Sequence, residues 1–190
     1  MEKLKDFCLN QRMNNLTEDY FKINEKELMQ YFHYSGNLGK LKLRFRFMKT
    51  WILHCLAYSS PIPNFAIKCQ RMRGVKIGKN CHISPYVQID LLYPEEISIE
   101  ENVSIGTNCI IFAHSNIPTN EHLKKYGYPR KIKSVIIRSG AIIGPGTIIT
   151  AGVTVGKNAM TAVGSVVTQD IPDSCIAVGN PARVIKKIDE

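Results

Sequence analysis

The sequence lacks any run of eighteen or more uncharged apolar residues, so it predicts no membrane-spanning helix. The start, residues 1–6, has neither a long apolar stretch nor a small-residue cleavage site, and we therefore expect a cytoplasmic protein that is not secreted. The six cysteines include no Cys-x-x-Cys pair, which argues against a zinc ribbon. Without a secretion signal a disulfide framework is also not expected, so the cysteines are read as reduced.

Acidic residues are absent from residues 40–76, which contain nine cations. The nine are Lys40, Lys42, Arg44, Arg46, Lys49, Lys68, Arg71, Arg73 and Lys76. Their charge equals the net charge of the whole chain, +9. A basic segment interleaved with Phe45, Phe47 and Trp51 is suited to an anionic partner such as a membrane surface, a phosphorylated substrate or nucleic acid. Alternatively, the aromatic residues pack a helix onto the fold and the cations face solvent.

A six-residue repeat begins at Val75 and predicts the fold. One anchor position per repeat is Ile77, Ile83, Ile89, Ile99, Ile105, Ile111, Ile137, Ile143, Ile149, Val155, Thr161 and Val167. The residues two places before the anchors are all small, β-branched or cysteine. Because alternate residues of a strand point to the same side, each repeat reads as a short strand with two inward side chains. Three strands make one coil, so twelve repeats predict four stacked coils.

Corners between the strands need residues that tolerate unusual backbone conformations. Glycine follows four of the anchors, and asparagine or glycine stands three places after eight of them. These residue types best tolerate positive φ.

The repeat is interrupted twice, by a small insertion between Ile89 and Ile99 and by a long one between Ile111 and Ile137. Insertions in a solenoid usually line its binding face, so both are candidate functional loops.

The pattern divides the chain into three predicted parts. Residues 1–74 form a mostly helical basic segment, in which the stretch from Leu41 to Leu56 lacks glycine and proline and the prolines after Ser59 end the helix. Residues 75–170 form the coil, with an extruded loop at 112–134. Residues 171–190 leave the repeat and form a short C-terminal cap.

The repeat, the histidine before the long loop and the tail resemble the hexapeptide-repeat acyltransferases. The tail motifs are Gly164–Thr168, Asp170–Pro172 and Gly179–Ile185. Similarity is greatest to the galactoside, maltose and serine acetyltransferase branch. The resemblance implies an all-β, left-handed parallel β-helix, which is an exception to the usual right-handed crossover. It also implies acetyl-CoA as co-substrate, no metal, and a homotrimer with active sites between subunits.

Candidate site residues follow from that resemblance. His114 matches the catalytic histidine of the family, and imidazole is suited to removing a proton from an acceptor hydroxyl or amine at neutral pH. Asp90, at the first insertion, is expected to contact the acceptor or to orient the histidine. Ser84 stands where sugar-specific relatives have a substrate-binding asparagine.

The resemblance also implies a set of coenzyme A contacts. The matching positions are Gly144, Ala162, Val163, Gly164, Thr168, Arg183 and Lys186. Small residues allow the pantetheine arm to approach the backbone, and the two tail cations suit its phosphates. Gln169 replaces a lysine that many sugar-specific relatives carry, which puts one phosphate contact in doubt.

The acceptor is expected to be a saccharide or a saccharide precursor. Residues 1–74 lack the N-terminal signature of the galactoside and maltose enzymes, and the basic, aromatic segment is closer to enzymes of surface-polysaccharide biosynthesis. This favours a peripheral contact with an anionic membrane, at its inner face, and no nucleic-acid partner. Two alternatives stay open: a non-catalytic trimeric scaffold, and an enzyme like the γ-type carbonic anhydrases, which needs three histidine ligands and their paired spacing.

Overall fold

The computed structural model describes residues 20–115 and 121–188. Residues 20–31 are helical and precede α2 (Gly36–Tyr58) and α3 (Pro63–Arg73). α2 includes the helix predicted from Leu41 to Leu56. α3 begins at a proline, whose fixed φ suits the first turn of a helix, and its C-cap is Gly74 at φ 115°.

The chain folds as two compact units that divide within α2. One contains helix 20–31, α2 as far as Arg46, and the loop end 121–130 with its short helix α4 (Glu121–Lys125). In this unit Arg130 Nε lies 3.1 Å from a Glu27 carboxylate oxygen, which ties the end of the loop to helix 20–31. The division at Arg46 differs from the sequence-based boundary at residue 74, which marks the change from helix to strand.

The other unit, Phe47–Ser115 and Lys131 onward, contains the strands. The first sheet is β1 (Lys76–Ile77), β4 (Ile97–Ile99), β9 (Val135–Ile137) and β12 (Thr154–Val155). The second is β2 (His82–Ile83), β5 (Ser104–Ile105), β10 (Ile142–Ile143), β13 (Met160–Thr161), β15 (Cys175–Gly179) and β16 (Ala182–Lys187). The third is β3 (Gln88–Ile89), β6 (Ile110–Ile111), β11 (Ile148–Ile149) and β14 (Val166–Val167).

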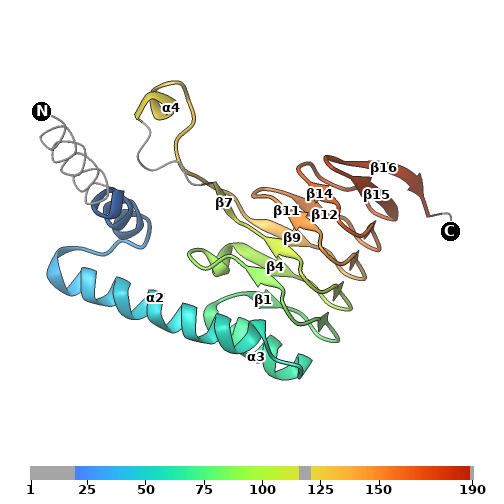
Figure 1. Cartoon of the computed structure of the whole chain (residues 1–190), viewed down its shortest axis with the longest axis horizontal. Coiled ribbons are helices and arrows are strands. Elements are labelled where there is room, and N and C mark those ends of the chain that lie inside the picture. Colours follow the sequence, from blue (N-terminus) through green and yellow to red (C-terminus); the bar gives the residue numbers. More distant parts are fainter. Residues whose placement is uncertain (1–19, 116–120, 189–190) are drawn as a thin grey trace, which may run out of the picture. The chain divides into compact units, whose positions relative to one another are not determined.

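Successive strands enter the first, second and third sheet in turn, so the chain winds as a three-sided parallel coil (Figure 1). From β1 to β14 the coil makes the four turns that the repeat predicts. The anchors are in register, as in the pairing of Ile89 with Ile111 and of Ile111 with Ile149. Eleven of the twelve anchors are buried, and only Ile77 is half-buried. Each buried isoleucine contributes about 1.5–3 kcal/mol, so this internal ladder is the main source of stability.

The corners confirm one part of the expectation and correct another. All eight residues predicted three places after an anchor have positive φ, from 53° at Asn80 to 87° at Gly152. The four glycines directly after anchors are required for a different reason. At Gly144, for example, an added Cβ lies 2.5 Å from the Thr161 carbonyl oxygen of the next coil. Glycine is needed there because the backbones of stacked coils approach closely.

Both insertions leave the coil at the same corner, between the third and first sheets. The small insertion contains the 3₁₀ helix η1 (Pro94–Glu96). The long one begins and ends in an antiparallel pair, β7 (His114–Ser115) and β8 (Lys131–Ile132). At the C-terminus, β15 and β16 form an antiparallel hairpin that extends the second sheet. In the described ranges, no helix combines the length and apolarity that crossing a bilayer requires.

Candidate functional site

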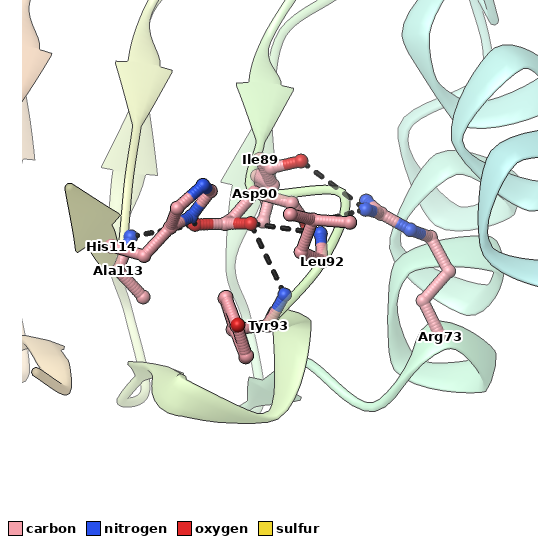
Figure 2. A network of polar contacts seen from close by, with 7 residues as sticks. All are labelled: Arg73, Ile89, Asp90, Leu92, Tyr93, Ala113 and His114. Atoms are coloured by element: carbon pink, nitrogen blue, oxygen red, sulfur yellow. Dashed lines mark hydrogen bonds and ion pairs between the residues drawn. The ribbon is translucent and has the colours of Figure 1, made fainter. Parts of the chain in front are cut away.

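Two residues of the predicted site meet where the insertions leave the coil. Asp90 directly follows β3 and His114 opens β7, one coil further along. The backbone N–H of Asp90 donates to the Ile111 carbonyl at 3.0 Å, which places the corners of the two coils in contact. Residues separated by 24 positions in the sequence are therefore held side by side (Figure 2).

The Asp90 carboxylate is fully buried and accepts four hydrogen bonds. Its Oδ1 accepts from the backbone N–H groups of Leu92 at 2.9 Å and Tyr93 at 3.1 Å. Its Oδ2 accepts from the Ala113 N–H at 2.9 Å and from His114 Nδ1 at 2.5 Å. Asp90 is 0% exposed, so of the two roles expected from the sequence its environment suits the orientation of His114 better than contact with an acceptor.

The environment keeps Asp90 ionised. Burial alone raises the pKa of a carboxyl group, and at Asp90 this is the largest influence. The hydrogen bond and charge of His114, together with the N–H groups of Ala113 and Tyr93, outweigh burial, so the pKa of Asp90 lies below its ordinary value. At neutral pH the site therefore contains a carboxylate that can only accept hydrogen bonds.

This carboxylate decides which nitrogen of His114 carries the proton. Since Asp90 can only accept, Nδ1 is the donor, and in the neutral imidazole the lone pair is on Nε2. No hydrogen bond engages Nε2 in the part of the chain described. The ring is held between Tyr93 and Phe112, with centroid separations of 5.1 and 6.4 Å, and its side chain is 12% exposed. A histidine held in this way could accept a proton at Nε2.

An open hollow of about 280 Å³ adjoins His114 at the same corner. It is lined by Phe112, His114, Ser115, Lys131, Lys133, Thr150 and Ala151. The Lys133 side chain lies over Gly152, where an added Cβ would be 2.8 Å from Lys133 Cδ. The hollow thus combines His114 with two cationic side chains, Lys131 and Lys133.

A buried arginine that the sequence reading placed among the surface cations supports the corner from behind. Arg73, 4% exposed, donates from Nη2 to the carbonyl oxygens of Asp90 at 2.6 Å and Ile89 at 3.2 Å (Figure 2). Its Nη1 donates to Gln70 at 2.5 Å and to His54 Nδ1 at 3.2 Å. Local sequence gives no signal for this role, because Arg73 is one of nine similar cations.

Burial lowers the pKa values of Arg73 and of its neighbour His54. Burial, followed by the neighbouring Arg73 charge, lowers the pKa of His54 to about 4, so His54 is neutral at pH 7. Burial also lowers the pKa of Arg73 to about 10, against the opposing influence of Asp90, and the guanidinium remains charged. A fixed positive charge therefore lies behind the Asp90 backbone.

Most of the predicted coenzyme A positions lie at another corner, between the second and third sheets. Gly144 follows β10, and Ala162, Val163 and Gly164 follow β13 one coil later. Val163 is 74% exposed, and a Cβ at Gly164 would meet no atom, whereas Gly144 is buried. Ser84, after β2, is half-buried at this same corner, with Oγ 3.4 Å from His82 Nε2. Within one chain, therefore, none of these residues joins the Asp90–His114 corner.

The remaining predicted residues lie toward the C-terminal end of the coil. Thr168 is exposed after β14, at the corner that also carries Asp90 and His114 in earlier coils. Arg183 and Lys186 are exposed on β16, opposite Val178 and Ile176 of β15. Among the described residues, no cluster of three or more histidine, cysteine or acidic side chains could hold a metal ion.

Comparison with known proteins finds relatives among the acetyltransferases. No family model matches the chain. The galactoside O-acetyltransferase of Lactococcus lactis subsp. lactis (strain IL1403) is 33% identical over 117 residues, which cover 60% of this chain and 56% of that protein. The chain spans about three fifths of the length of the curated relatives that it matches.

Solved structures agree with the sequence relatives. A hexapeptide-repeat containing acetyltransferase from Vibrio cholerae has a TM-score of 0.65 at 21% identity, covers 78% of this chain and 94% of its own, and shares the fold. A galactoside acetyltransferase in complex with coenzyme A has a TM-score of 0.61 at 25% identity, over 77% of this chain and 82% of its own. The family resemblance predicted from the repeat and tail is thereby confirmed.

Proposed function

We propose that this chain, whose relatives are hexapeptide-repeat acetyltransferases, transfers an acetyl group from acetyl-CoA to a hydroxyl or amine of a saccharide or saccharide precursor. The observation that carries the proposal is the pairing of His114 with a buried, ionised Asp90 beside an open hollow. A histidine fixed in this tautomer, with Nε2 left for a substrate, is what direct acetyl transfer needs.

In the proposed reaction, His114 Nε2 takes the proton of the acceptor group as that group attacks the thioester carbonyl. The Asp90 carboxylate holds the Nδ1 proton and stabilises the imidazolium that forms. The tetrahedral intermediate then collapses, the carbon–sulfur bond breaks, and the imidazolium returns the proton to the departing sulfur. No acyl-enzyme is formed, and the histidine ends in its starting state.

Acetyl-CoA supplies the activated acetyl group, and the chain has residues that fit it. The exposed backbone at Val163 and Gly164 leaves space for a pantetheine arm, and Gly144 allows the two coils there to stack closely. Arg183 and Lys186, both exposed on β16, suit the nucleotide phosphates. The coenzyme A complex of a galactoside acetyltransferase with this fold supports the assignment.

We propose further that the coil is left-handed and that the active enzyme is a homotrimer. The support is the separation of the proposed coenzyme A positions and the Asp90–His114 pair on two different corners of one coil. Neighbouring subunits that pack corner to corner bring the two sets together in a shared groove. Ser84, at the coenzyme A corner, would then enter the groove beside the acceptor.

The decisive experiment measures coenzyme A release from acetyl-CoA with a panel of sugars, nucleotide-sugars and amino acids. We expect release to depend on a saccharide acceptor and to fall roughly 10²–10⁴-fold in His114→Ala, with coenzyme A affinity little changed. A matched control is His33→Asn, because His33 is exposed with a φ of 54° that asparagine tolerates. Activity of His114→Ala within threefold of wild type would remove His114 from the mechanism.

A further inference from the structure

The solvent side of α2 carries a continuous apolar stripe. Its members recur every three or four residues and so lie on one face of the helix. They are Leu38, Leu41, Phe45, Met48, Ile52 and Leu56, which are 75, 50, 63, 55, 44 and 47% exposed. Phe47 and Trp51, on an adjoining face, are 47 and 52% exposed. These three aromatic side chains are thus about half exposed or more, whereas the alternative in which they pack onto the fold expects them to be buried.

The buried residues of α2 lie on the side of the helix opposite the stripe. Leu43, Thr50, His54 and Ala57 are all buried, and they share a face about 150° around the helix from the stripe. Ala57 packs with Ala66 and Cys69 of α3 in a small apolar cluster, and His54 contacts Arg73. The apolar stripe is therefore accessible to a partner while the contacts on the buried side of α2 stay intact.

The structure sorts the nine cations of the basic segment into two groups. Four have a contact within the chain. Arg73 is buried, Arg71 donates to the carbonyls of Ile77 and Gly78, Lys40 pairs with Glu25, and Arg46 lies over the Phe32 ring. The other five are exposed: Lys68 on α3, Lys76 on β1, and Lys42, Arg44 and Lys49 on α2. At 100° per residue, Lys42 and Lys49 border the stripe on one side and Arg44 borders it on the other.

We infer that α2 docks on the surface of an anionic lipid bilayer, with the apolar stripe at the acyl boundary and Lys42, Arg44 and Lys49 at the headgroups. Aliphatic and aromatic side chains flanked by cations are the pattern of helices that lie in the membrane interface. Trp51, next to Arg44 on the same side of the stripe, suits the headgroup level. This surface goes beyond the proposed chemistry and does not depend on it.

Charge and side-chain type favour a lipid bilayer over two other partners for this face of α2, a second copy of the chain and nucleic acid. A two-fold contact of this face with itself would bring like cations together, and residues 40–76 contain no acid to pair with them. Nucleic acid would satisfy the cations but leave Leu38, Met48 and Ile52 exposed, because phosphates and sugars do not bury aliphatic side chains. A bilayer satisfies both the charge and the apolar stripe.

The test is co-sedimentation of the full chain with vesicles of phosphatidylcholine alone and of phosphatidylcholine with about one third phosphatidylglycerol. We expect binding to the anionic vesicles, weakened by high salt, and none to the neutral ones. The triple variant Lys42→Gln, Arg44→Gln, Lys49→Gln should reduce binding about tenfold or more, because each cation near the surface adds attraction to anionic lipid. A matched control removes three exposed cations of the coil, Lys79, Arg138 and Lys157, and should bind as wild type does.

A second measurement tests the stripe itself. Trp51 is the only tryptophan, so its fluorescence reports directly on α2 and should shift to shorter wavelength with anionic vesicles. Phe45→Ser with Ile52→Ser should abolish that shift while acetyl transfer to a soluble acceptor is unchanged, because both residues are exposed. The proposal is overturned by absence of binding, by equal loss in the control triple variant, by RNA binding in place of vesicle binding, or by a change in lipid-free oligomer mass in the serine variants.

Discussion

Replacing Asp90 with asparagine tests the proposed site most sharply, because the structure predicts how the amide will sit. Asp90 faces four donors, two at each oxygen: Leu92 and Tyr93 at Oδ1, Ala113 and His114 at Oδ2. Asparagine offers one oxygen and one NH₂ group in the same shape. One pair of donors must therefore meet the amide NH₂ group.

The two orientations differ in cost. If the NH₂ group faces Leu92 and Tyr93, two backbone donors lose their acceptor, and each buried unpaired group costs roughly 1–3 kcal/mol. If it faces Ala113 and His114, only the Ala113 N–H is orphaned, because the imidazole can move its proton to Nε2 and accept at Nδ1. The second orientation is thus favoured, and it removes the lone pair that the proposed reaction uses.

We therefore expect Asp90→Asn to remain folded but to lose roughly 10²–10⁴ in kcat, equivalent to about 3–5 kcal/mol in the barrier. The affinity for coenzyme A should change little. Nitrogen-15 NMR of labelled histidine should show the His114 proton on Nδ1 in the native protein and on Nε2 in the variant. A native tautomer together with kcat within threefold of wild type would refute the reasoning.

The remaining predictions concern stability and assembly. Arg73→Met should lower the free energy of unfolding by roughly 2–4 kcal/mol in a denaturant titration, since it leaves the Ile89 and Asp90 carbonyls without their donor, and stability equal to wild type would contradict this. Because His54 has a pKa of about 4 in the folded chain against 6.5 in the unfolded one, the unfolded state binds the extra proton, so stability should be highest above pH 6.5 and fall as the pH drops toward 4. His54→Gln should flatten that part of the profile. Gly144→Ala should cost roughly 1–3 kcal/mol, because its Cβ would meet the Thr161 carbonyl oxygen at 2.5 Å. Gly164→Ala would meet no atom and should cost only the roughly 1–2 kcal/mol of a side chain in the left-handed region, since its φ is 69°. Light scattering at micromolar concentration should give the mass of three chains, and a monomer would defeat the shared-groove proposal.

The sequence by itself determined the coil. Its repeat fixes which side chains point inward, and because a strand alternates strictly, the anchors from Ile83 to Val167 could be placed without any knowledge of contacts. The corner residues followed for the same reason, since the backbone conformation they adopt is a local property of asparagine and glycine. The candidate base followed from the family resemblance, which implies a catalytic histidine just before the long insertion.

Only the tertiary structure decided what surrounds that base. The bond from His114 to Asp90 spans 24 positions, and the support from Arg73 reaches across 17, so neither is encoded by any local pattern. The same is true of the basic segment, in which one arginine is buried behind the site while the neighbouring helix exposes an apolar stripe. The sequence does not show which of these cations is buried and which is exposed. Burial depends on which coil or helix packs against each side chain, and that is a property of the tertiary structure.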